Sequence, residues 1–220
     1  MTLIRLLQLS DSAFPSGGFT HSSGMEAAAH HGDVASVEDV ERIVRIAVRQ
    51  AAMGLAPLLL AAYRDPVQLP ALDARADLFL NQPVGNRASR AQGLALLAAA
   101  ARVFPDAGLD VVADRVRTTP LHGHHAPIFG VVMRALGVDA DEAGRLFLFQ
   151  SARTPAAAAV RLGVIGAFDG QRVQTLMEPA IEPALAACRD LGPDDIVQTA
   201  PVLDLLQSTQ DRLYSRLFQS

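Results

Sequence analysis

Three histidines near the middle of the chain are the side chains whose spacing most directly offers metal chemistry. His122, His124 and His125 lie close together, and imidazoles at positions i and i+2 or i+3 can chelate nickel, copper or zinc. The pair His30–His31 offers the same ligand a second time. A complete site also needs a carboxylate or a thiol, and none is adjacent in the sequence. The cluster therefore indicates either a weak or transient metal contact, or polar loop residues before a helix that begins at Pro127.

The segment Asp11–Glu26 (DSAFPSGGFTHSSGME) is the most unusual stretch of the sequence. The pair Gly17–Gly18, shortly after a proline, predicts a turn in which backbone N–H groups can be exposed to an anion. The segment lacks the spacing and the lysine of a phosphate-binding loop, and no strand precedes it. Ser22 and Ser23 follow His21, but neither has the flanking glycines of a nucleophile elbow. Two interpretations stay open: a turn that joins two helices, or a loop that faces a partner or a ligand.

The C-terminal segment interleaves aromatic residues with arginines, although a chain terminus is normally polar and frayed. Tyr214, Leu217 and Phe218 give it apolar surface to bury, either on its own fold or on another protein. Arginine and aromatic residues are enriched in protein–protein contacts. Its polar and aromatic members are Gln210, Arg212, Tyr214, Arg216, Phe218 and Gln219.

The elements that must position these residues are predicted to be helices, because alanine and leucine dominate and no region alternates with period two. The clearest helix begins at Ser36, an N-cap residue followed by Asp39 in the manner of a capping box. We therefore predict an all-α fold, a single-domain helical bundle of about ten helices. Further helices are expected over 71–81, 85–103, 107–117, 127–136 and 202–213.

Prolines set two further expectations about helix ends. A helix that begins at Asp139 is expected to end near Ala152, because Thr154–Pro155 has the form of an N-cap and a first-turn proline that open a new helix. A later helix that begins at Asp169 is expected to be kinked or broken by its two internal prolines.

The composition limits the classes of protein that this chain can be. It has 220 residues, with 19 Lys+Arg against 23 Asp+Glu, and every basic residue is an arginine. The hydrophobic fraction of 50% is enough for a core and excludes a disordered chain. The mild acidity argues against binding nucleic acid through bulk charge. The single cysteine, Cys188, excludes an internal disulfide framework and a CxxC zinc site. We find no signal peptide and no membrane span, and we expect a cytoplasmic globular protein.

The opening and closing blocks of the sequence together resemble the signature of the urease accessory protein UreF family. The opening block is Leu6–Phe19 (LLQLSDSAFPSGGF) followed by His21–Glu26 (HSSGME), and the closing block is Gln210 with Tyr214–Ser220 (YSRLFQS). The blocks lie in the order found in that family and reach both termini, so the resemblance covers the whole chain.

The resemblance implies an all-α, non-enzymatic maturation factor with no catalytic residue and no cofactor of its own. UreF-like proteins form homodimers, bind UreD (also called UreH) and recruit the nickel-carrying GTPase UreG. The assembly docks on apo-urease for nickel insertion, and the UreF-like protein is expected to modulate GTP hydrolysis by UreG. Neither nucleic acid nor a membrane is an expected partner.

The resemblance also implies which parts of this chain contact partners. Residues 1–220 are expected to form one UreF-like helical domain, with the N-terminal segment 1–26 and the C-terminal tail 207–220 as partner-binding regions. The implied partner-binding residues are Pro15, Gly17, Gly18, Phe19, His21, Ser22, Gly24, Glu26, Gln210, Tyr214, Arg216, Leu217 and Phe218.

Two alternatives stand beside this hypothesis. One is a direct nickel chaperone that binds the metal through His122, His124 and His125. The other is a small helical hydrolase that uses the Gly17–Gly18 loop as an anion site. We expect no nucleotide turnover, because no Ser/Thr–Asp arrangement that could hold magnesium follows these glycines.

Overall fold

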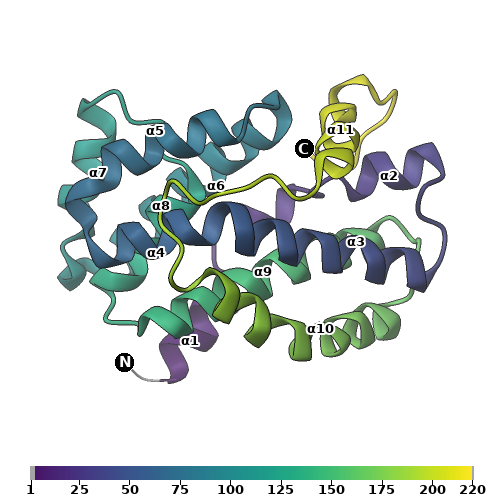
Figure 1. Cartoon of the computed structure of the whole chain (residues 1–220), viewed down its shortest axis with the longest axis horizontal. Coiled ribbons are helices and arrows are strands. Elements are labelled where there is room, and N and C mark those ends of the chain that lie inside the picture. The colour runs from purple at the N-terminus through teal and green to yellow at the C-terminus, as the bar shows by residue number, and fades with distance from the viewer. Residues whose placement is uncertain (1–2, 220) are drawn as a thin grey trace.

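The computed structural model describes residues 3–219, and this part of the chain is all-α, with no β-strand. Figure 1 shows α3 and α4 running end to end through the middle of the bundle, with α9 and α10 along one side. The predicted all-α bundle is therefore confirmed. The α-helices are α1 (Leu3–Ser10), α2 (Met25–His31), α3 (Val37–Gln50), α4 (Ala56–Arg64), α5 (Leu69–Phe79), α6 (Pro83–Val103), α7 (Leu109–Thr118), α8 (His125–Ala135), α9 (Ala140–Arg161), α10 (Ala167–Cys188) and α11 (Pro201–Ser208). Shorter elements are the 3-10 turns η1 (Gly18–Thr20), η3 (Pro66–Gln68), η4 (Pro105–Ala107) and η5 (Gln210–Arg212), and the π-helical segment η2 (Ala51–Leu55).

The core consists of two clusters of buried side chains. In the larger one, α4 and α8 cross so closely that a Cβ atom on Gly130 would lie 2.2 Å from the carbonyl oxygen of Leu59. Only glycine allows the two backbones to approach in this way. The smaller cluster includes residues of α2, α3, α9 and α10, and it contains both Met25 and Phe218. One side chain of the C-terminal tail, Phe218, is therefore part of the core.

Helices α3 and α4 are joined through η2 into the stretch Val37–Arg64, which by length and composition alone could cross a membrane. In the structure 61% of its most apolar window is buried inside the bundle, which is typical of a core helix in a globular protein. The carbonyl oxygen of Met53, within η2, accepts the backbone N–H of Val197 at 3.0 Å. This bond fixes the linker between α10 and α11 against the middle of the stretch.

The capping box predicted at Ser36 is confirmed. Ser36 Oγ accepts the backbone N–H of Asp39 at 3.2 Å, and Asp39 Oδ2 accepts the backbone N–H of Ser36 at 3.2 Å. Hydrogen bonds from the Ala35 backbone, then from Ser36 and Arg42, lower the pKa of Asp39 to about 2. The first turn of α3 is thus held by side chains that lie within a few residues of it.

The helix start predicted at Thr154–Pro155 is wrong. Helix α9 continues unbroken through both residues to Arg161, with Pro155 inside it. Thr154 Oγ1 donates to the carbonyl oxygen of Gln150 at 2.9 Å, a bond back along the same helix and not an N-cap. Pro155 is buried, so packing of this face outweighs the backbone hydrogen bond that the proline ring removes.

Helix α10 begins at Ala167, slightly before Asp169, and it is continuous through Pro179 and Pro183. The helix is therefore not broken at either proline, and a kink there stays a prediction. Both prolines are exposed, so water can bind the carbonyl oxygens that lose their helical partner. The buried side chains on the other face of this part of α10 are Met177, Ile181 and Leu185.

The helices near the chain ends also differ from expectation. Helix α1, which is not among the helices predicted from the sequence, ends against α9. Gln150 Nε2 donates to the carbonyl oxygen of Leu9 at 3.4 Å, and the Arg153 guanidinium donates to that of Ser10. These bonds satisfy carbonyl groups that a helix end leaves free. At the other end, the helix expected over 202–213 stops at Ser208 and is followed by η5.

Candidate functional site

The two segments that the sequence singles out, one near each terminus, lie against each other. In Figure 1 the C-terminal end of the chain lies beside α2 and α11. The backbone N–H of Gln219 donates to the carbonyl oxygen of Thr20 at 2.9 Å. Helix α11 also packs on α2. One surface is therefore built from both ends of the chain.

Glu26 is the side chain that holds the tail. It is 6% exposed, and its carboxylate accepts the backbone N–H of Leu217 at 2.5 Å and of Phe218 at 3.2 Å. It also accepts a hydrogen bond from the side-chain amide of Gln210, which is fully buried. A buried carboxylate is stable only with such partners, because burial removes its hydration. Here all three donors come from the C-terminal segment.

Phe218 fills a slot beside Arg161 of α9. The Arg161 guanidinium carbon lies 4.2 Å from the centre of the Phe218 ring and 4.0 Å from that of Phe19. Arg161 Nη1 also donates to the carbonyl oxygen of Phe19 at 2.5 Å. Each cation–π contact contributes about 0.5–2 kcal/mol. One arginine thus links the tail, the N-terminal segment and α9.

The tail divides into side chains that face the body and side chains that face solvent. Gln210 and Phe218 are buried, whereas Tyr214 is fully exposed and Leu217 is 54% exposed. Arg216 is also exposed and forms an ion pair with Asp211 at 3.2 Å. The exposed aromatic and aliphatic groups are therefore presented by a backbone that is fixed from below.

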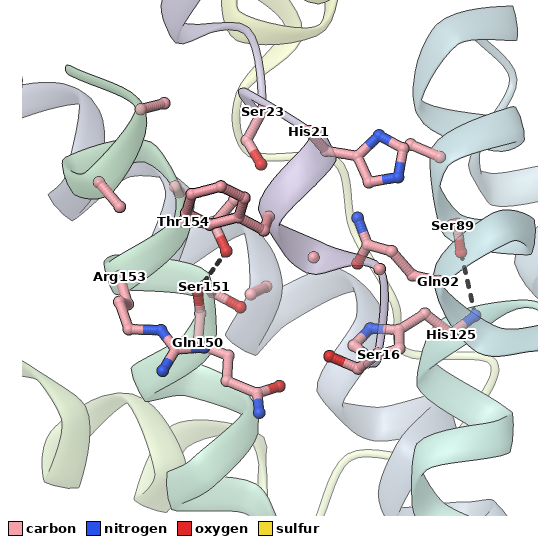
Figure 2. Close-up of a pocket in the computed structure, with 18 of the residues that line it drawn as sticks. Ser16, His21, Ser23, Ser89, Gln92, His125, Gln150, Ser151, Arg153 and Thr154 are labelled. Atoms are coloured by element: carbon pink, nitrogen blue, oxygen red, sulfur yellow. Dashed lines mark hydrogen bonds between the residues drawn. The ribbon is translucent and has the colours of Figure 1, made fainter. Parts of the chain in front are cut away.

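A cavity of about 770 Å³ lies beneath the N-terminal segment. Figure 2 shows His21 and His125 on one side of it, with Gln92 between them, and polar side chains of α9 on the other. Burial lowers the pKa of His125 to about 4 and also lowers the pKa of His21, so both rings are neutral near pH 7. Sequence reasoning missed this cavity, because its lining comes from many separate segments. Its labelled polar lining residues are Ser16, His21, Ser23, Ser89, Gln92, His125, Gln150, Ser151, Arg153 and Thr154.

The histidine cluster is divided by the fold. His124 is buried, with Nε2 3.1 Å from Asp77 Oδ1, whereas His122 Nε2 is 3.8 Å from Asp77 Oδ2. His125 points elsewhere, and its ring packs against two phenylalanine rings of the core. Burial lowers the pKa of His124. Within residues 3–219, no group of three or more His, Cys, Asp or Glu side chains is placed to hold a metal ion. His30 and His31 contact each other edge to face, with ring centres 5.7 Å apart.

Asp77, His124 and Ser89 form a hydrogen-bonded chain of the residue types found in serine hydrolases. His124 Nδ1 lies 3.1 Å from Ser89 Oγ. Ser89 Oγ, however, already accepts the backbone N–H of His125 at 3.2 Å. The backbone N–H groups of residues 122–124, which could otherwise stabilise an oxyanion, are bound to the buried carboxylate of Asp73. Ser89 and Asp73 therefore satisfy the backbone N–H groups at the start of α8, and these groups are not free to act in catalysis.

Comparison with known proteins decides the family. A family model described as UreF matches residues 34–178. The chain belongs to the UreF family. It is 35% identical over 217 residues to urease accessory protein F of Arabidopsis thaliana, covering 97% of this chain and 90% of that relative. It is 34% identical over 218 residues to urease accessory protein F of Oryza sativa subsp. japonica, covering 96% and 82%. It is 32% identical over 217 residues to urease accessory protein UreF of Paenarthrobacter aurescens (strain TC1), covering 99% and 97%.

In this UreF-family chain some residues of the opening motif lie at the surface, and others are buried and support them. Of its predicted partner-binding residues, Pro15 and Phe19 are exposed, and Gly17 and Gly18 are half-buried. The others, listed from the N-terminal side, are buried: His21, Ser22, Gly24 and Glu26. The first two residues of the segment 1–26 and the last residue of the tail 207–220 lie outside the described residues.

Gly24 shows why the UreF-family motif needs a glycine at the start of α2. Its φ of 83° lies in the left-handed region that favours glycine. A Cβ atom there would lie 3.2 Å from the Leu203 side chain of α11. The residue thus allows both the turn into α2 and the close approach of the helix that leads into the tail.

Proposed function

We propose that this UreF-family chain is a cytoplasmic urease maturation factor that bridges UreD/UreH and the GTPase UreG during nickel insertion into apo-urease. The observation that carries the proposal is the match, over nearly the full length of the chain, to proteins named urease accessory proteins. In this proposal the chain is a scaffold and not an enzyme: it presents two ends of a helical body to other proteins.

The solvent-facing part of the tail supports a role in binding partners. Tyr214 and Leu217 are exposed on the same tail as Phe218, which shares Arg161 with Phe19, and Phe19 is itself 58% exposed. Interfaces concentrate their binding energy in a few aromatic, aliphatic and arginine side chains that are already positioned. The contacts of Glu26 with the tail backbone provide that positioning. We propose that this surface contacts UreD/UreH.

A homodimer is part of the proposal, and α1 offers a surface for it. Leu3, Ile4 and Leu7 are 69%, 74% and 59% exposed on this helix. Neighbouring exposed apolar side chains commonly mark a protein–protein contact. Two copies of α1 related by a two-fold axis would bury these side chains against each other.

The proposed effect on UreG requires no chemistry by this chain. A scaffold can accelerate a GTPase by orienting its switch loops, or by placing an arginine against the charge that develops on the transferred phosphate. The chain carries 19 basic residues, all arginines, so any cationic group that it offers to UreG is a guanidinium.

The proposal can be tested by co-expressing the tagged chain with UreD/UreH, UreG and the urease subunits. We expect the wild type to co-purify with UreD/UreH and UreG, and to raise urease activity and urease-bound nickel. The double variant Tyr214→Asp/Leu217→Asp should lose UreD/UreH. The matched control is Leu78→Asp, an exposed position on α5, which should retain it. Full retention by the double variant would contradict the tail assignment, and no co-purification by the wild type would contradict the bridging role.

A further inference from the structure

The last part of the chain is held in the way that a bound peptide is held. From Leu213 to Gln219 it forms no helix or strand. Leu213 and Phe218 are buried, while the side chains of the three residues between Leu213 and Leu217 are exposed. The segment therefore touches the body at two anchor points and crosses the surface between them. Segments with few buried contacts and no regular backbone ladder open locally at low free-energy cost.

Recognition of this segment is mostly recognition of its main chain. Three successive backbone N–H groups, those of Leu217, Phe218 and Gln219, donate to the Glu26 carboxylate and to the carbonyl oxygen of Thr20. Main-chain bonds with one side-chain pocket are how proteins bind extended peptides in general. Here the pocket takes the Phe218 ring beside Arg161.

The groove that receives the tail is built from parts that the tail does not hold in place. Glu26 follows Met25, which is fully buried in the smaller core cluster. Arg161 belongs to α9 and is bonded to the carbonyl oxygen of Phe19. Gln210, in η5, precedes the segment and stays hydrogen-bonded to Glu26 when Leu213–Gln219 leaves, and water can then reach the rest of the carboxylate, so the groove persists.

We propose that this tail groove, formed by Thr20, Phe19, Glu26 and Arg161, is a peptide-binding site, and that the chain's own C-terminal tail is its exchangeable occupant. Its ligand is an extended peptide with three successive free N–H groups and an aromatic side chain on the middle one. The proposal does not depend on any role in urease maturation, and its test needs only the purified chain and a synthetic peptide.

The experiment measures binding of a fluorescein-labelled peptide with the sequence of Asp211–Gln219 by fluorescence anisotropy. The receptors are the full-length wild type and the full-length Phe218→Ala variant, whose own tail lacks the anchoring ring. The variant should bind the peptide saturably. The wild type should bind at least about tenfold more weakly, because its own tail leaves only a small fraction of grooves free. A Phe218→Ala peptide should bind the variant at least about tenfold more weakly, whereas a Tyr214→Ala peptide should bind within about twofold.

A second measurement uses the wild type alone, so it tests the proposal even if the Phe218→Ala variant folds poorly. Hydrogen exchange at the backbone amides of Leu217, Phe218 and Gln219 is followed with and without excess unlabelled peptide. Displacement of the tail should accelerate exchange at these amides. Equal peptide affinity of the two receptors, no binding by a folded Phe218→Ala variant, or tail exchange that excess peptide leaves unchanged would each overturn the proposal.

Discussion

Replacement of Glu26 by glutamine should loosen the tail while leaving the core intact. Glu26→Gln keeps the length of the side chain and one acceptor oxygen. It replaces the other oxygen with an NH2 group, which is a donor. In the wild type the two carboxylate oxygens serve the N–H groups of Leu217 and Phe218 and the amide of Gln210. In the variant at least one of these donors would therefore face another donor.

The size of the effect follows from this loss. A hydrogen bond to a charged group contributes about 1.5–3 kcal/mol, so losing one such bond should cost about 2 kcal/mol. At 25 °C this lowers the ratio of docked to free tail about 30-fold. We expect no larger loss of stability, because a free tail exposes its N–H groups to water and the helices around Met25 stay packed.

Hydrogen exchange measured by mass spectrometry checks this prediction. In Glu26→Gln the amides of Leu217 and Phe218 should exchange about 30-fold faster than in the wild type, with little change in α4 and α8. The matched control is Glu38→Gln, at an exposed position in the first turn of α3, where tail exchange should not change. Wild-type exchange of the tail in Glu26→Gln, or equal acceleration in Glu38→Gln, would show that the Glu26 carboxylate does not hold the tail.

Four further predictions concern Gly130, His125 and Asp204. Gly130→Ala should lower the free energy of unfolding by about 2–4 kcal/mol in urea titrations, because its methyl group would meet a carbonyl oxygen of α4 at 2.2 Å. Since burial lowers the pKa of His125 from 6.5 to about 4, the unfolded chain takes up a proton between these pH values and the folded chain does not. Stability should then fall by up to about 3 kcal/mol as the pH drops through this window, and His125→Gln should lose that slope. Burial raises the pKa of Asp204 to about 6 and so acts in the opposite direction, and Asp204→Asn should therefore show a steeper acid loss than the wild type. In equilibrium dialysis against nickel, His125→Ala should leave the bound stoichiometry unchanged, because this ring packs in the core away from His122 and His124. A loss in that variant would favour the direct nickel chaperone.

Local signals in the sequence were sufficient for most of the helices and insufficient where packing competes with them. The capping box of Ser36 and Asp39 involves residues that lie within one turn, so their spacing alone predicts the start of α3. Pro155 gives an equally clear local signal for a helix start, yet α9 passes through it. What decides that position is burial against other helices, and a single stretch of sequence does not contain this information.

The candidate site could be predicted as two separate segments but not as one surface. Residue types marked both the opening block and the tail, whereas the bond between Glu26 and Leu217 spans a sequence separation of 191. The sequence also could not predict which side chains of the tail are buried and which are exposed. An extended segment with no partner strand has no periodicity that would distinguish Tyr214 from Phe218. The histidines are a second example of a contact that the sequence does not reveal. No carboxylate is adjacent to His124 in sequence, and the fold supplies one from α5.

The two blocks that carry the UreF-family resemblance form the two sides of a single contact, and this affects how variants in the opening block should be interpreted. Gly24 leaves room for α11 to approach, and Glu26 binds the tail backbone. Phe19 contacts Arg161, which also contacts the buried Phe218 ring of the tail. A substitution at Gly24 or Glu26 can therefore abolish partner binding by displacing the tail, without either residue touching a partner. Direct contact is a sound inference only for side chains that face solvent while the tail is docked. Tyr214 meets this condition, and a Tyr214 variant that keeps wild-type exchange at the tail amides but loses a partner would identify a true interface residue.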